Sequence, residues 1–164
     1  MFILRATAKL RQRMGASTGH DGEQSTTLLG DWYATMLAWR PQVALLVNEH
    51  TLLPVLMPLA PAATLPARAA GHVGDVLAAH GVPSTVISAE VDHMRHWAIA
   101  PTANRSVVGI MNEFAFLADT YRSATNPNLI DLAVRLAATP CSPLYKRHIS
   151  PDRELAALLD HTGT

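Results

Sequence analysis

The stretch Thr102–Phe116 constrains the fold of this chain most, because several structural patterns meet in and beside it. An apolar run, Trp97–Ala100, ends at Pro101 just before it. The polar group Asn104–Ser106 then separates that run from a second short apolar segment, Val107–Met111. Short apolar runs bounded by turn residues are typical of strands. The pattern therefore predicts a strand, a turn and a second strand.

A helix is expected directly after this second predicted strand. Asn112 is a residue type that caps helix N-termini, because its side-chain oxygen accepts from free backbone N–H groups. The apolar positions that follow recur with a helical period and share one face. They are Phe114, Leu117, Ala118 and Tyr121. This face is expected to pack on the sheet.

Three further segments read as strands. Met1–Ala6 is mainly apolar, and Val43–Val47 is a continuous apolar run of the kind found in central strands. After a polar turn at 48–50, Thr51–Met57 returns as its hairpin partner. Two prolines in and after this last segment cannot donate to a ladder, so it is expected at an edge or a bulge.

Helical periodicity and capping residues predict most of the remaining elements. Helices are expected over 8–14, 66–80, 127–138 and 151–160, from Ser84, and from Gly30-Asp31 with Tyr33, Met36 and Leu37 on one face. Strands and helices do not alternate regularly enough for a doubly wound parallel sheet. The sequence therefore predicts a single α+β domain over 1–164, with a mainly antiparallel sheet of about four or five strands packed by about six helices.

Charge and composition limit the classes of function. The net charge is zero, with 13 basic and 13 acidic residues, whereas proteins that bind nucleic acid normally carry a basic excess. The basic side chains near the N-terminus, from Arg5 to Arg13, are interpreted as a solvated helix face or as an anion contact. One cysteine excludes an intrachain disulfide, and no segment has the apolar length of a membrane span. We expect a soluble, cytoplasmic protein without nucleic-acid or membrane partners.

Sequence motifs for common chemistries are missing or weak. The chain has no phosphate-binding glycine loop and no nucleophile elbow, so no nucleotide cofactor is expected. Glu90, His93 and His96 do not form a known zinc motif and are interpreted as surface residues near a helix end. Cys141 is interpreted as a packed small residue rather than a nucleophile. The early aromatics, Trp32 among them, are interpreted as core.

Several segments together carry a family resemblance. NRSVVGIMNEFAF (104–116) occurs with LGDWYA (29–34), VNEHTLLPVLMP (47–58), LPAR (65–68) and TPCSPL (139–144). In this order they resemble a bacterial family described only as a domain of unknown function, with the motif NRSVxGxMN[DE]FAF. The resemblance implies a bacterial, single-domain, soluble protein. It implies no activity and no catalytic residues.

The polar residues of the central stretch form the strongest candidate site. Asn104, Arg105 and Ser106 occupy a predicted turn, while Asn112 and Glu113 stand where a helix is expected to begin. Two interpretations remain open. The first is structural, with an N-cap and an Arg105–Glu113 ion pair. The second is a polar pocket at the ends of strands and helices.

In the pocket interpretation, the 48–50 turn contributes Asn48 and Glu49 and lies close to 104–106 at one end of the sheet. Glu113 or Glu49 would act as a base or hold a divalent cation, and Arg105 with a helix N-terminus would meet an oxyanion. The function hypothesis is a small hydrolase of an ester or lactone. The alternative is a non-catalytic module that binds a protein or nucleic acid through the basic N-terminal helix.

Overall fold

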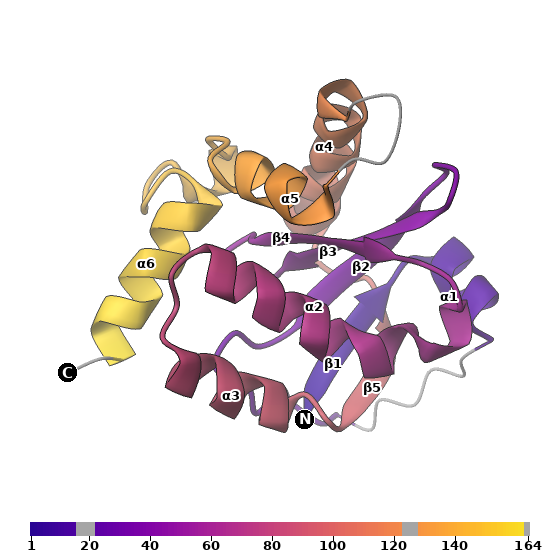
Figure 1. Ribbon diagram of the computed structural model, residues 1–164, viewed down its shortest axis with the longest axis horizontal. Helices are drawn as coiled ribbons and strands as arrows, with labels where there is room; N and C mark the ends of the chain where they lie inside the picture. The colour runs from indigo at the N-terminus through magenta and orange to yellow at the C-terminus, as the bar shows by residue number, and fades with distance from the viewer. Residues whose placement is uncertain (16–21, 123–127, 163–164) are drawn as a thin grey trace.

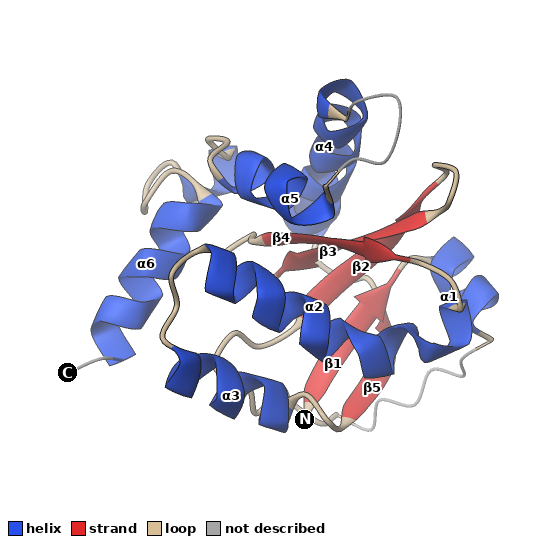
Figure 2. Ribbon diagram, viewed as in Figure 1, coloured by secondary structure: helices blue, strands red, loops and turns tan. Residues whose placement is uncertain are grey.

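The computed structural model describes residues 1–15, 22–122 and 128–162, and five of its strands form one mixed sheet (Figure 2). The strand order is β4-β3-β2-β1-β5. The bounds are β1 Phe2–Ala6, β2 Trp32–Leu37, β3 Val43–Asn48, β4 Pro54–Pro58 and β5 Trp97–Pro101. Strands β2, β3 and β4 pair antiparallel, whereas β1 pairs parallel with both β2 and β5.

Six α-helices accompany the sheet in the described residues, and the predicted α+β class is confirmed. They are α1 Ala8–Met14, α2 Leu65–Ala79, α3 Ser84–His93, α4 Arg105–Tyr121, α5 Leu129–Ala137 and α6 Pro151–Thr162. Short 3-10 turns lie at Ala62–Thr64 and Ser142–Leu144. None of these helices has the length and apolar character needed to cross a membrane.

The sheet separates two hydrophobic cores. Side chains alternate between the faces of a strand, so Trp32 and Ala34 of β2 join the core beneath α2 and α3, and Tyr33 joins the core beneath α4. Figure 1 shows α2 running along one side of the sheet. Helix α5 packs beside edge strand β4 and contributes to both cores, which closes that edge.

The hairpin predicted around 48–50 is confirmed, and so is the edge position of its second strand. Val47 pairs with Pro54 and Val43 with Pro58, so the two prolines stand at the ends of β4. Beyond Pro58, the Arg68 guanidinium donates to three backbone carbonyls of the 58–61 segment at 2.8–3.0 Å. This fixes the connection from β4 to α2.

The helix predicted from Gly30-Asp31 is wrong, because this segment forms β2. The spacing of Tyr33, Met36 and Leu37 suggested one helical face. In the structure Met36 packs on one core, while Tyr33 and Leu37 belong to the other. A strand buried on both faces is apolar at nearly every position, so its sequence cannot be separated from a buried helix by periodicity alone.

The strand predicted at Val107–Met111 and the helix start predicted at Asn112 are also wrong. Helix α4 begins at Arg105, and its N-cap is Asn104, eight residues before the predicted cap at Asn112. The Asn104 Oδ1 atom accepts from Ser106 N at 2.9 Å and from Val107 N at 3.3 Å. Val107, Ile110, Met111 and Phe114 are buried on one face of this helix. The apolar segment is therefore the first part of a longer amphipathic stripe.

Candidate functional site

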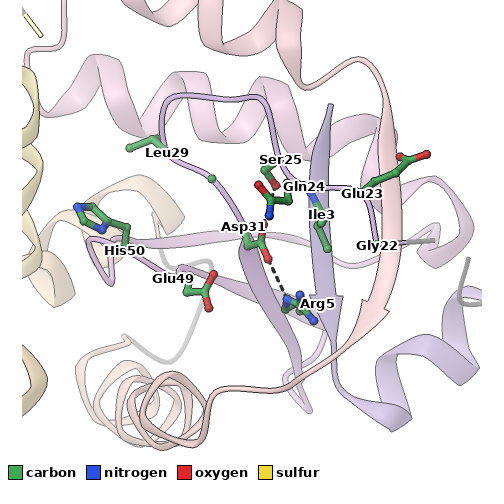
Figure 3. A pocket seen from close by; sticks show the side chains of 11 residues that line it. Ile3, Arg5, Gly22, Glu23, Gln24, Ser25, Leu29, Asp31, Glu49 and His50 are labelled. Atoms are coloured by element: carbon green, nitrogen blue, oxygen red, sulfur yellow. Dashed lines mark hydrogen bonds and ion pairs between the residues drawn. The ribbon is translucent and has the colours of Figure 1, made fainter. Parts of the chain in front are cut away.

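A polar cavity of about 470 Å³ opens on the α4 side of the sheet, where β1, β2 and β3 lie next to one another. We call it the Arg5–Glu49 pocket (Figure 3). Its polar lining includes Arg5, Gln24, Ser25, Asp31, Glu49 and His50. Three of its charged side chains, those of Arg5, Asp31 and Glu49, come from the interior of β1 and from the ends of β2 and β3.

Strand register brings these residues together. Arg5 pairs with Tyr33, and Tyr33 pairs with Val47 on the other side of β2. Asp31 stands two positions before Tyr33, and Glu49 two positions after Val47. Positions two apart share a face of a sheet. All three charged side chains therefore lie on one face at one end of the central strands.

An ion pair forms the floor of the pocket. Arg5 Nε lies 2.9 Å from Asp31 Oδ2, and the two side chains are only 19% and 15% exposed. Arg5 Nη1 donates to the Pro101 carbonyl at 3.2 Å. The Ser25 hydroxyl donates to Asp31 Oδ1 at 2.7 Å and accepts from Ile3 N at 3.0 Å. The guanidinium and carboxylate are thus held in fixed positions.

Glu49 is the second carboxylate of the pocket and is half-buried. Its pKa is raised above the ordinary value of 4.5, first by burial and then by the negative charge of Asp31. Arg5, the Tyr33 hydroxyl and, least of the three, the charge of His50 act in the opposite direction. The result is a carboxylate that accepts a proton more readily than a solvated glutamate does.

Tyr33 joins the pocket to the start of α4. Its ring is fully buried, and its hydroxyl accepts from the Asn104 N–H at 2.9 Å. Burial raises the pKa of Tyr33, and the Asn104 N–H lowers it. The Tyr33 hydroxyl also lowers the pKa of Glu49 through a side-chain hydrogen bond. The Asn104 backbone and Glu49, from the two predicted turns, therefore both contact Tyr33.

Asn48 supports the pocket from inside the fold and is fully buried. Its Nδ2 donates to the carbonyls of Leu29 at 2.7 Å and Asp31 at 3.2 Å. Its Oδ1 accepts from the Thr51 amide and the Thr51 hydroxyl, both at 2.9 Å. This amide ties the 48–51 turn to the segment that carries Asp31.

The remaining candidates from the sequence lie on the exposed side of α4. Arg105 and Ser106 follow the N-cap, and Asn112 and Glu113 stand in the middle of the helix. None of the four lines the Arg5–Glu49 pocket. Within the described part of the chain no ion pair joins Arg105 to Glu113.

Sequence reasoning missed the Arg5–Asp31 pair. Arg5 was grouped with the basic residues of the next helix, and Asp31 was placed in the first turn of a helix that does not exist. One signal was present in the sequence. Arg5 is a charged residue inside the apolar strand β1, and a charge in such a position is rarely left without a partner.

Other reactive side chains have structural partners. Cys141 is buried, and burial, with the charge of Glu113, raises the pKa of its thiol to about 12, so the nucleophilic thiolate is suppressed. Glu90 is 2% exposed and accepts from Leu28 N and Leu29 N at 2.8 and 2.9 Å. Over residues 1–15, 22–122 and 128–162, no three His, Cys, Asp or Glu side chains gather as a metal site would require.

Fold and site define an α+β protein with a polar pocket at one end of its sheet. The chain belongs to the family DUF6933, a domain of unknown function, whose model matches residues 3–154. The matched segment includes every pocket residue discussed here. No curated protein and no solved structure matches the chain significantly.

Proposed function

We propose that this protein is a small hydrolase that cleaves an activated carbonyl, an ester or a lactone, in the Arg5–Glu49 pocket. The observation that carries the proposal is the half-buried Glu49 carboxylate, which lies in an open polar cavity beside a fixed guanidinium. A general base and a cation that meets the oxyanion are the minimum requirements for this chemistry.

Glu49 is the base in this mechanism. Burial and Asp31 raise its pKa toward the working pH, which increases its tendency to take a proton from water. The hydroxide equivalent attacks the carbonyl carbon, and the carbonyl electrons move to oxygen. Collapse of the tetrahedral intermediate expels the alkoxide, which takes the proton from Glu49. In this mechanism the Tyr33 hydroxyl donates to the Glu49 carboxylate and so orients it.

Arg5 is the group that meets the oxyanion. Asp31 holds Nε and the Pro101 carbonyl holds Nη1, while Nη2 has no hydrogen-bond partner within the described residues. A guanidinium held at two of its nitrogens needs little reorganisation when negative charge develops beside the third. These contacts support Arg5 rather than Arg105 as the cation that meets the oxyanion. They support Glu49 rather than Glu113 as the general base.

The test is a panel of small esters and lactones assayed with wild type, Glu49→Gln and Glu113→Gln side by side. Each protein is assayed with added calcium or magnesium and with chelator, because a carboxylate can act as a base or hold a cation. We expect turnover by wild type and Glu113→Gln, and a loss of about 100-fold or more in Glu49→Gln.

The pH profile gives a second readout. The base must be ionised, so kcat/KM should rise through a pKa above 4.5 and this limb should be absent in Glu49→Gln. Equal turnover by wild type and Glu49→Gln contradicts the assignment of the base. Turnover lost only in Glu113→Gln moves the chemistry to α4. No turnover by any protein on the whole panel rejects the hydrolase proposal.

A further inference from the structure

The charge of the Arg5–Glu49 pocket is unbalanced. The Arg5 guanidinium is matched by Asp31 at 2.9 Å, which leaves the Glu49 carboxylate as a second negative charge on the same face. Glu23 also lines the cavity, but its side chain is turned away from this group in Figure 3. With Glu49 ionised, the inner part of the pocket therefore holds one more negative charge than positive charge.

His50 offsets this excess of negative charge only weakly. Burial, Asp31, Arg5 and Tyr33 all affect the pKa of Glu49 more than the charge of His50 does. The His50 Nε2 atom lies 3.2 Å from Arg147 Nη2. Arg147 is itself bound to the buried Glu154 carboxylate at 2.8 Å, so its charge is matched outside the pocket.

The polar atoms around the cavity are mainly acceptors. Glu49 offers two carboxylate oxygens, and each Asp31 oxygen keeps a lone pair beyond its bond to Arg5 or Ser25. The Gln24 side-chain amide lines the same space and carries one acceptor oxygen and two N–H donors. A further donor is Arg5 Nη2, the group proposed to meet the oxyanion. A ligand that fits must bring several donors and positive charge.

We propose that the Arg5–Glu49 pocket takes a small molecule that carries a protonated primary amine, placed against Glu49 and Asp31, with its carbonyl toward Arg5. An ammonium group has three N–H donors and a full positive charge, which match the acceptors and the excess charge. The inference rests on the site of the proposed hydrolase and specifies its substrate class.

A bound ammonium also favours the reactive form of the base. The charge of Asp31 opposes ionisation of Glu49 in the empty pocket. A cation between the two carboxylates offsets this repulsion, so Glu49 stays ionised when the amine is present. One carboxylate oxygen faces the ammonium, and the other remains for water. An anionic ligand would instead meet Glu49 and Asp31 and be repelled.

The first experiment measures binding without chemistry. Butylammonium, butan-1-ol and butyrate have nearly the same size and differ in charge. Titrations followed by amide NMR shifts, at one low ionic strength, should show butylammonium binding about tenfold or more tightly than the other two, which corresponds to about 1.4 kcal/mol. The preference should disappear in Glu49→Gln and weaken as salt is added.

A matched charge control separates the pocket from the general field of the protein. Asp75 is exposed on α2, which packs on the opposite face of the sheet, so Asp75→Asn removes one negative charge at a distance. It should keep the full preference for butylammonium. Equal binding of the three probes, tighter binding of butyrate, or an equal loss in Asp75→Asn and Glu49→Gln overturns the inference.

The second experiment measures turnover of glycine ethyl ester, ethyl propionate and monoethyl malonate at about pH 6, where an α-amine is protonated. We expect kcat/KM to fall in that order. Turnover of the neutral ester with no preference for the amine rejects the ammonium inference and keeps the hydrolase. Selective butylammonium binding without turnover of any ester keeps the inference and rejects the hydrolase.

Discussion

Replacement of Asn48 by alanine tests the support of the site most directly. This buried amide makes four hydrogen bonds, two to backbone carbonyls and two from Thr51. In Asn48→Ala the Thr51 N–H and the Leu29 carbonyl lose their partners inside the protein, whereas the Thr51 hydroxyl keeps its bond from Leu53 N at 3.1 Å. The Asp31 carbonyl keeps its bond from Glu49 N at 3.0 Å.

The magnitude follows from these two orphaned groups. Each buried group left without a partner costs about 1–3 kcal/mol. We therefore expect Asn48→Ala to lower the free energy of unfolding by about 2–6 kcal/mol, with a small further cost for the cavity. With a urea m-value of about 2 kcal/mol/M, the midpoint should fall by about 1–3 M.

The assay is urea unfolding followed by circular dichroism, with Asn112→Ala as the matched control. Asn112 is exposed in the middle of α4, where alanine is the better helix former. The free energy of unfolding of Asn112→Ala should therefore differ from wild type by no more than about 0.5 kcal/mol. If Asn48→Ala costs less than about 1 kcal/mol, or no more than the control, then Asn48 does not brace the turn and this account of the site fails.

Three further predictions concern charge, packing and reactivity. Because the pKa of Glu49 is raised in the folded state, its ionisation opposes folding, so Glu49→Gln should be more stable than wild type at pH 7. That advantage should vanish below pH 4.5, where wild-type Glu49 is protonated in both states; denaturation at the two pH values checks the sign. Phe114→Ala should lower the free energy of unfolding, measured in urea, by about 3–5 kcal/mol, because Phe114 is 1% exposed. Leu117→Ala should lower it by less, because Leu117 is only half-buried. Cys141 should react with a thiol reagent at pH 8 only after urea is added, and rapid reaction of the native protein would contradict its raised pKa of about 12.

Elements with local sequence signals were predicted correctly. The α1 helix was predicted over 8–14, and the structure has Ala8–Met14 with Gly15 as its left-handed C-cap at a φ of 65°. The β3–β4 hairpin, α2 with its early proline and α6 after Ser150 were found in the same way. In each case the capping residue, the turn residues and the apolar periodicity that define the element all lie within a few residues of one another.

Local signals were not enough where two readings competed. Asn104 and Asn112 are both good caps, and the choice between them depends on which apolar residues meet the sheet. The sheet lies beneath Val107, Ile110 and Phe114, so the helix begins at the first asparagine. Likewise, β2 was taken for a helix because burial on both faces conceals the period of a strand.

The composition of the site depends on strand pairing, which the sequence does not reveal. Parallel pairing of β1 with β2 brings Arg5 to Asp31 across 26 positions of the chain, and antiparallel pairing of β2 with β3 adds Glu49. Sheet register is set by packing over the whole face, and no short sequence window contains it. Alternation along a strand determines which face of the sheet a side chain occupies. The pairing of that strand with its neighbours determines which other side chains it contacts.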